Sequence, residues 1–357
     1  MTARTTRKLD LFSCAMIALA LITLTLLLAG GYYLWRISLL PFPTSTPLPA
    51  TTSLSPDLAS PSPTDTAPAP ATATTAPATV TPTSTSSPWT QDPSGLIVFT
   101  CYIDQVVDQI CTIQADGSDY TRLTTSTATD WYAAFGPGNT HIVFSSRQPN
   151  RFEIYEMEAD GANLRRLTED IGSGLYAPDI SPDGRQIVFT NERAGTQSIW
   201  VMDRDGGNPR PLTDTAFEDL DPIWSPDGNL IAFASNRSGS RQIYIINADG
   251  TDPHRVTNLP DMGGRISWSP DGQRLAFYAG PPNQHQAYTI SVDGTGLIQL
   301  TDSGNNTAPC FSPDGEWLVF ASSRDGDLEL YLIRPDGSDL RQLTFNTYSD
   351  WQPRWSH

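Results

Sequence analysis

The chain has 357 residues with 30 Pro, 4 Cys, 4 His and a net charge of −17 at pH 7, and this length suits either two or three average domains or one large repeat domain. Four bases balance four acids in residues 1–92, so the whole acidic excess lies in residues 93–357. A surface this acidic repels phosphate backbones and anionic lipid headgroups, which argues against nucleic-acid binding. The few His and Cys leave little material for a zinc site or a disulfide-framework fold.

An apolar segment near the N-terminus predicts a membrane anchor. Between Asp10 and Arg36 lie 25 residues without a charge, and a helix of that length, at ~1.5 Å per residue, covers the ~30 Å of a bilayer core. Three bases precede the segment and one follows it. The positive-inside rule therefore predicts a cytoplasmic N-terminus (residues 1–10), a single transmembrane helix (residues 11–35) and an extracytoplasmic remainder.

The alternative of a cleaved signal peptide fits less well. A signal peptide has a shorter apolar stretch that ends at a small-residue cleavage site. Here Gly30 and Gly31 are followed by aromatic residues of the kind that sit at the headgroup level, Tyr32, Tyr33 and Trp35. We therefore expect an uncleaved signal anchor, and we expect contact with the membrane through residues 11–35 only.

A low-complexity segment follows the predicted anchor. From Pro41 to Asp92 the sequence consists almost entirely of Pro, Thr, Ser and Ala, with three acidic residues and no base. Such a segment cannot bury enough apolar surface to offset the entropy of the chain. Residues 36–92 are therefore predicted to be a disordered linker, and their composition also suits O-glycosylation.

Residues 93–357 repeat one pattern six times. An Ile/Leu-x-Phe strand recurs at intervals of 43–45 residues, with its Phe at positions 99, 144, 189, 233, 277 and 320. Each copy continues with a second β-type run, an Asp-Gly turn and a third strand that ends in Leu-Thr or Val-Thr. A fourth strand leads into Ser-Pro-Asp-Gly in most copies. Four strands in about 44 residues are typical of a propeller blade, so the predicted fold is an all-β six-bladed β-propeller.

The two ends of this region look like halves of one repeat. The sequence ends at Trp355-Ser356-His357, the first half of a Trp-Ser-Pro-Asp-Gly unit, and Pro93-Ser94-Gly95 resembles the second half. We therefore expect a C-terminal strand, residues 352–356, to complete the blade that residues 96–124 begin. A ring closed in this way leaves no long free sheet edge.

The repeated motif resembles the WD40-like propeller repeats of the TolB family. The resemblance covers residues 93–357 and rests on Trp/Phe-Ser-Pro-Asp-Gly, Ile-x-Phe, Ile-Tyr, Asp-Gly and Leu-Thr. The first copy departs from it at Phe135-Gly136-Pro137-Gly138, which lacks the Asp but keeps a turn. Similar repeats form the propellers of prolyl oligopeptidase-type peptidases. The resemblance implies protein–protein interaction at the cell envelope.

Catalytic motifs are absent from the sequence. It contains no Gly-x-Ser-x-Gly nucleophile elbow, and no residues remain for a separate α/β domain. The histidines fall at different positions of the repeat, His141, His254, His285 and His357, which argues against one convergent metal site. The Asp-Gly pairs recur in every copy, so a turn explains them better than a calcium loop does. We expect no metal, no cofactor and no enzymatic activity.

Function on a repeated scaffold is expected where the repeats differ. The copies differ at two positions, which lie five and four residues before the last large residue of each inner strand. We hypothesise that an acidic, aromatic funnel at one channel mouth receives a peptide or a cationic group, formed by Asp130, Trp131, Tyr176, Asp219, Asp350 and Trp351. The alternative is that the Asp residues cap turns and the rings pack between blades.

The cysteines allow one cross-strand disulfide. Cys101 and Cys111 lie on paired strands of the first hairpin, in a region predicted to be outside the cytoplasm, so a disulfide or two small buried side chains would both fit. Cys310 is expected to be buried and free.

The sequence thus predicts a membrane-tethered, monomeric propeller that acts as a non-enzymatic protein- or peptide-binding scaffold. The alternative is a carbohydrate-binding domain or an enzyme of the lyase or lactonase type that uses the channel mouth.

Overall fold

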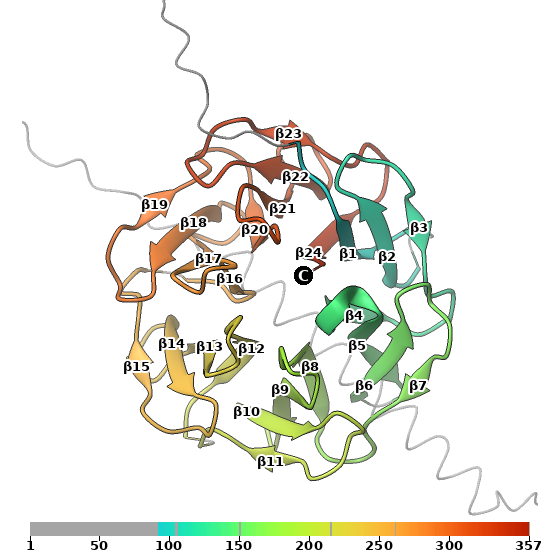
Figure 1. The fold of residues 1–357 in the computed structure, drawn as a ribbon, viewed down its shortest axis with the longest axis vertical. Helices are drawn as coiled ribbons and strands as arrows, with labels where there is room; N and C mark the ends of the chain where they lie inside the picture. Colours follow the sequence, from blue (N-terminus) through green and yellow to red (C-terminus); the bar gives the residue numbers. More distant parts are fainter. Residues whose placement is uncertain (1–91, 104–105, 150, 215, 261, 357) are drawn as a thin grey trace, which may run out of the picture. The chain divides into compact units, whose positions relative to one another are not determined.

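The computed structural model describes residues 92–356 except 104–105, 150, 215 and 261. Six four-stranded antiparallel sheets stand like blades around a central channel (Figure 1). The predicted all-β six-bladed propeller is therefore confirmed. The predicted cytoplasmic segment, anchor and linker lie, apart from Asp92, outside the described residues. Within the described part, no helix is long and apolar enough to cross a membrane.

The six sheets share one plan, with the innermost strand beside the channel and a two-residue strand at the outer edge. The first blade, in sheet order, consists of β24 (Asp350–Trp355), β1 (Leu96–Cys101), β2 (Gln109–Gln114) and β3 (Thr121–Arg122). The second and third consist of β4 (Asp130–Phe135), β5 (His141–Gln148), β6 (Arg151–Glu158) and β7 (Arg165–Arg166), and of β8 (Gly174–Ile180), β9 (Gln186–Arg193), β10 (Thr196–Asp203) and β11 (Arg210–Pro211).

The remaining blades follow the same order. The fourth consists of β12 (Asp219–Trp224), β13 (Leu230–Ser235), β14 (Gln242–Asn247) and β15 (His254–Arg255). The fifth and sixth consist of β16 (Ser267–Trp268), β17 (Arg274–Ala279), β18 (Gln286–Ser291) and β19 (Ile298–Gln299), and of β20 (Asn306–Phe311), β21 (Leu318–Ser322), β22 (Glu329–Ile333) and β23 (Arg341–Gln342). One short 3-10 helix, η1 (Pro137–Asn139), occupies the turn after β4.

The repeated Phe residues form the core between the blades. All six are buried, and in four blades the Phe ring lies 5.7–6.2 Å from a Tyr ring on the paired strand. The first blade has Cys111 opposite Phe99, and the ring of Tyr120 packs there instead, with its centroid 5.4 Å from that of Phe99. Burial of one large aromatic ring per blade stabilises each sheet by roughly 1.5–3 kcal/mol per side chain.

The Asp-Gly turns have a structural role in every blade. The Asp carboxylate accepts a hydrogen bond of 2.9 Å from the backbone N–H two residues later in all six copies. The following Gly has φ between 82° and 92°, a region that favours glycine. A Cβ on this Gly would also lie only 2.1–3.8 Å from a backbone oxygen of the neighbouring blade. The pair therefore forms the turn and permits close packing of the blades.

The other two motifs are also explained by hydrogen bonds. The Thr of each Leu-Thr or Val-Thr accepts a hydrogen bond of 2.9–3.0 Å from a backbone N–H fourteen residues earlier. In Ser-Pro-Asp-Gly, the Ser hydroxyl donates to the Asp carboxylate at 2.5–2.6 Å. The same hydroxyl accepts from the backbone N–H five residues later at 2.9 Å. Each motif residue thus holds one turn of the blade in place.

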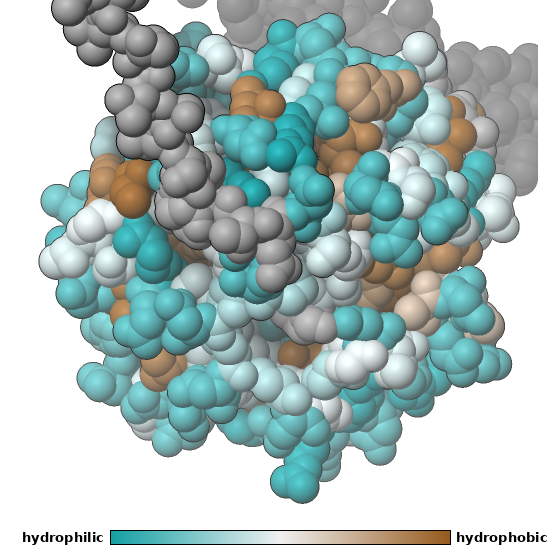
Figure 2. Space-filling model, turned by 45° about the horizontal axis from the view of Figure 1, so that its top comes forward, coloured by the Kyte–Doolittle hydropathy of each residue, from teal (hydrophilic) through white to brown (hydrophobic). Residues whose placement is uncertain are grey.

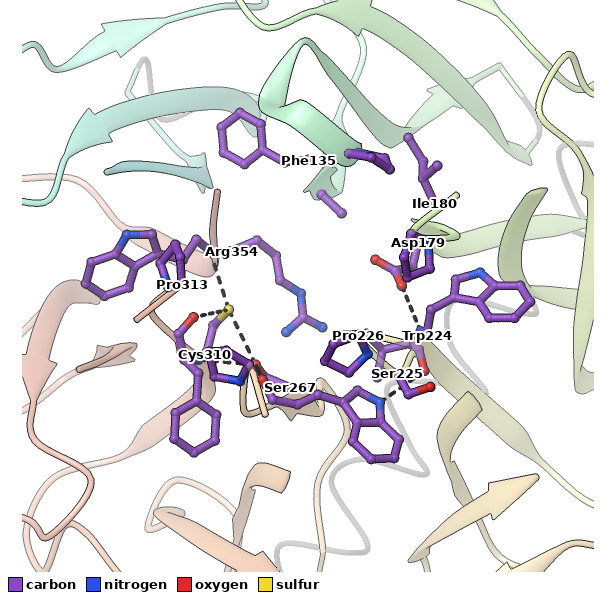
Figure 3. Close-up of a pocket in the computed structure, with 18 of the residues that line it drawn as sticks. Phe135, Asp179, Ile180, Trp224, Ser225, Pro226, Ser267, Cys310, Pro313 and Arg354 are labelled. Atoms are coloured by element: carbon purple, nitrogen blue, oxygen red, sulfur yellow. Dashed lines mark hydrogen bonds between the residues drawn. The ribbon is translucent and has the colours of Figure 1, made fainter. Parts of the chain in front are cut away.

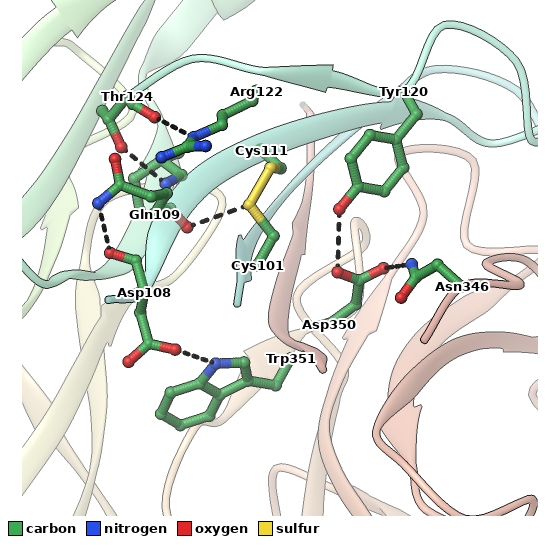
Figure 4. The surroundings of a disulfide bond; sticks show 11 residues. Cys101, Asp108, Gln109, Cys111, Tyr120, Arg122, Thr124, Asn346, Asp350 and Trp351 are labelled. Atoms are coloured by element: carbon green, nitrogen blue, oxygen red, sulfur yellow. Dashed lines mark hydrogen bonds between the residues drawn. A yellow bond between two sulfur atoms is a disulfide. The ribbon is translucent and has the colours of Figure 1, made fainter. Parts of the chain in front are cut away.

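The first blade unites the two ends of the propeller. Strand β24 pairs antiparallel with β1, so that Trp355 lies opposite Ile97 and Asp350 opposite Cys101. The buried Trp355 donates a hydrogen bond from its indole Nε1 to the carbonyl oxygen of Ser94 at 2.9 Å. Of the two arrangements that the sequence allows for Cys101 and Cys111, the structure contains the disulfide, in the same blade and with a Cα–Cα distance of 5.9 Å (Figure 4). Cys310 is buried and free.

Candidate functional site

The innermost part of each blade contains a bulge that shapes the channel. Three residues before the last large residue of the inner strand, the backbone takes a φ of 49–60° in all six blades. In five of the blades the ladder register shifts at this point, for example between Trp131 and Ala134. A bulge re-aims the side chains that follow it. We call the six residues with positive φ the waist ring: Tyr132, Ala177, Asp221, Arg265, Ala308 and Gln352.

A cavity of about 350 Å³ opens where the inner strands end (Figure 3). We call this end of the channel, which is bordered by the Ser-Pro-Asp-Gly turns, the turn-side mouth. Its border carries five exposed prolines, Pro137, Pro182, Pro226, Pro270 and Pro313. Below them lie the last large residues of the inner strands, Phe135, Ile180, Trp224, Trp268, Phe311 and Trp355. The next layer, which we call the cavity ring, consists of Ala134, Asp179, Ile223, Ser267, Cys310 and Arg354.

Three members of the cavity ring fasten neighbouring blades together. Asp179 accepts a hydrogen bond from the backbone N–H of Trp224 at 2.8 Å. Ser267 and Cys310 accept equivalent bonds from the next blade, at 3.1 Å and 3.4 Å. Burial raises the pKa of Asp179 to about 6, against the opposing effects of the Trp224 N–H and of two arginines. These polar side chains are therefore partly occupied by the fold itself.

Arg354 differs from the other members of the cavity ring. Its side chain extends from β24 toward the middle of the cavity, and Asp179 lies on another part of the wall (Figure 3). The residue is only 7% exposed, and its Nη1 atom is buried without a hydrogen-bond partner among the described residues. A buried donor without an acceptor costs about 1–3 kcal/mol or more when charged. Among the described residues, the Arg354 Nη1 is thus a buried donor that the fold leaves without an acceptor.

Within the waist ring, Arg265 makes contacts across the channel. Arg265 donates from Nη2 to the carbonyl oxygen of Gln352 at 3.2 Å, and its guanidinium lies 5.1 Å from the centre of the Tyr132 ring. Its backbone N–H donates to the Asp221 carboxylate at 3.0 Å. Burial lowers the pKa of Arg265 to about 9, a shift that Arg354 reinforces and Asp221 opposes. The two rings together hold two arginines and two aspartates, so the channel is polar although its entrance is apolar.

The predicted funnel residues lie at the opposite mouth, and their carboxylates are turned away from solvent. Asp130, Asp219 and Asp350 are at most 2% exposed. Asp219 pairs with Arg237 at 2.8 Å, while Asp350 accepts hydrogen bonds from Tyr120 at 3.0 Å and Asn346 at 2.7 Å. Because they start strands whose first residue faces the blade interior, they cannot form an exposed acidic ring. Burial raises the pKa of Asp130 to about 6 and that of Asp350 to about 7.

The three predicted aromatic residues do come together. The Trp131 and Trp351 rings are 5.9 Å apart, and both indole N–H groups donate to Asp108, at 2.7 Å and 3.3 Å. Phe152 stacks on Trp131 at 4.8 Å and lies 5.2 Å from Tyr176. These rings pack across blades, and Trp131, Tyr176 and Trp351 remain partly exposed, whereas Phe152 is buried. The binding role assigned to the six residues stays a prediction.

Variation between the repeats also marks the polar residues of the two rings, which the sequence analysis did not select. The positions one and three residues before the last large inner-strand residue vary as much as the chosen ones, and they include the only Arg and Asp of the two rings, Asp179, Asp221, Arg265 and Arg354. On the face of the molecule that Figure 2 shows, hydrophobic residues form small groups among hydrophilic ones.

The fold and the site define a class of protein, the six-bladed β-propellers with a cavity at one channel mouth. The model of the TolB beta propeller domain matches residues 172–262 and 253–357, more than half of the chain together. The chain therefore belongs to the TolB β-propeller family.

Solved structures with a similar fold include TolB proteins and an enzyme. TolB from Acinetobacter baumannii is 24% identical, with a TM-score of 0.67 over 75% of this chain and 68% of its own. A putative TolB from Agrobacterium tumefaciens is 21% identical, with a TM-score of 0.58 over 72% and 91%. An oligogalacturonate lyase in complex with manganese is 14% identical, with a TM-score of 0.51 over 70% and 73%. Likeness at these identities establishes the fold alone.

Proposed function

We propose that this protein is a monomeric, non-enzymatic scaffold that binds a protein or peptide ligand at the turn-side mouth of its channel. Membership of the TolB propeller family supports a protein-binding role at this coarse level. The observation that carries the assignment to this mouth is the cavity itself, which has an apolar entrance and polar groups at its base. Binding sites commonly combine apolar walls with a few placed polar groups.

The entrance suits an extended peptide segment. Five exposed prolines surround it, and the Trp and Phe rings beneath them, each at most 6% exposed, line an apolar wall with their edges. Aromatic side chains are enriched at protein interfaces because they bury a large area at little cost in conformational entropy. A cavity of about 350 Å³ holds one or two side chains of a ligand, while the rest of the ligand covers the prolines.

We also propose that the propeller is tethered to a membrane and faces the extracytoplasmic side. The 25 uncharged residues before Arg36 support the anchor, and the Pro/Thr/Ser-rich stretch supports a spacer. The Cys101–Cys111 disulfide supports an oxidising compartment, because cytosolic thiols are kept reduced. Protease added to intact spheroplasts should degrade the propeller, whereas resistance until lysis would contradict this topology.

Site-specific photocrosslinking tests the binding role. A photoreactive residue at Pro226, at the turn-side mouth, should yield a discrete covalent adduct in intact cells, and one at Pro270 should yield the same adduct. A photoreactive residue at Leu297, exposed on the outer edge of the fifth blade, serves as the matched control. An adduct at Pro226 and Pro270 but not at Leu297 supports the proposal. Equal adducts at all three positions, or none, would refute it.

A further inference from the structure

We propose that Arg354 is the anchor for a carboxylate group of the ligand, bound in the cavity at the turn-side mouth. This inference rests on the proposed function and adds the chemical group that the site recognises. Two carboxylates could supply that chemistry, the C-terminus of a peptide or an acidic side chain within it.

The guanidinium of Arg354 carries a buried donor that the blades do not use. Arg354 is 7% exposed, and its Nη1 has no acceptor among the described residues. The three cavity-ring neighbours that accept hydrogen bonds receive them from the backbone of the next blade. Arg354 has only donors, so it cannot take part in that pattern. The Arg354 side chain therefore does not hold neighbouring blades together in the way that Asp179, Ser267 and Cys310 do.

The side chain of Arg354 is also directed at the place where a ligand would enter. Arg354 follows the bulge at Gln352, which has a φ of 54°, and points into the cavity (Figure 3). A guanidinium presents its donors in a planar fork that matches a carboxylate with two parallel hydrogen bonds. A ligand that enters past the prolines would meet this fork at the base of an apolar pocket, where water competes little.

The charges around Arg354 favour a singly charged anion. Asp179 shares the cavity ring with Arg354, and Asp221 lies in the waist ring below it. The propeller also carries the whole net charge of −17. This field disfavours a dianion such as a phosphate monoester more strongly than it disfavours a single carboxylate. Asp179 can in addition accept a hydrogen bond from a peptide N–H beside the carboxylate.

A matched set of peptides tests the inference on the full-length chain by calorimetric titration. Acetyl-Ala-Phe carries a terminal carboxylate, acetyl-Glu-Phe-amide a side-chain carboxylate, and acetyl-Gln-Phe-amide none. Inorganic phosphate is a fourth arm. At least one carboxylate peptide should bind about ten- to a hundredfold tighter than the Gln peptide, because a charge-assisted hydrogen bond is lost with the carboxylate. The tighter of the two identifies the source of the group.

Variants separate this inference from the proposed function. In Arg354→Gln the preference for a carboxylate should disappear, and in Arg354→Lys part of it should return. Arg185→Gln, which removes an 84%-exposed arginine near the same mouth, should leave the preference unchanged. Equal binding of all three peptides to the unaltered chain would overturn the inference while leaving a binding cavity. Failure of every peptide to bind at millimolar concentration, or tighter binding of phosphate, would also overturn it, whereas only the crosslinking result decides the proposed function.

Discussion

The guanidinium of Arg265 lies 5.1 Å from the centre of the Tyr132 ring, although the two residues come from opposite blades of the propeller. The contact spans the channel at its waist and divides it into two mouths of different character. The turn-side mouth leads to the cavity with Arg354, and the other mouth carries the Trp131–Trp351 cluster.

This contact predicts energetic coupling across the channel. In a double-mutant cycle with Arg265→Met and Tyr132→Leu, urea denaturation should give a coupling free energy of about 0.5–2 kcal/mol, the range of a desolvated cation–π pair. The cycle is needed because Arg265→Met alone also removes the donor to the Gln352 carbonyl and one of the cations that act on the Asp221 carboxylate. Additive effects of the two substitutions would contradict a direct interaction.

The buried Asp350 predicts a pH-dependent stability. Its pKa in the folded protein is about 7, above the ordinary value of 3.8, mainly because of burial. The folded state therefore holds the proton more tightly between about pH 4 and pH 7. The contribution of Asp350 to the free energy of unfolding should therefore be largest below about pH 4. It should be lost as the pH rises through 7, by on the order of a few kcal/mol.

Asp350→Asn provides the measurement. The amide carries no charge at any pH, so the difference in unfolding free energy between pH 5 and pH 8 should be smaller in this variant than in the unaltered protein. Part of the pH dependence should remain because Asp130 and Asp179, each with a pKa of about 6, act in the same direction. Asp252→Asn, at an exposed turn, should change nothing; an unchanged slope in Asp350→Asn would refute the assignment.

The disulfide should stabilise the first blade. Cys101 and Cys111 are separated by 10 residues, and closing a loop of this size stabilises a folded chain by about 2–3 kcal/mol. The double variant Cys101→Ala, Cys111→Ala should lose that amount in chemical denaturation and should no longer respond to a reductant. Cys310→Ala is the control because Cys310 is free, and it should keep the reductant sensitivity. Reductant-insensitive unfolding of the unaltered protein would contradict a bond in solution.

The pairing of β24 with β1 predicts that Trp355 is essential for stability. Trp355→Ala should cost about 3–5 kcal/mol, because it removes a fully buried ring and its hydrogen bond to Ser94. Trp200→Ala is the control, because it makes the same substitution at a half-buried residue, and it should lower the free energy of unfolding clearly less. Equal losses in thermal unfolding would argue against the joining of the two ends in one blade.

The repeat residues were predictable because each makes the same local bond in every blade. The Thr at positions such as Thr124 and the Asp at positions such as Asp116 accept hydrogen bonds that depend only on nearby sequence. The site was less predictable because the inner strands contain a bulge. With residues such as Arg265 at positive φ, the side chains that reach the cavity are not those that a regular strand would present. Simple alternation suggests that Asp219 faces the channel mouth and that Arg354 points into the blade. In the structure, Asp219 is buried in the blade and Arg354 points into the cavity.

The most direct test of the account is a comparison of the two mouths in one spectrum. The nine tryptophans can be replaced by 5-fluorotryptophan and their fluorine resonances assigned by single Trp→Phe variants. On addition of the partner captured at Pro226, the resonances of Trp224, Trp268 and Trp355 should shift, while those of Trp131 and Trp351 stay in place. Shifts confined to Trp131 and Trp351 would place the ligand at the opposite mouth and would contradict the account.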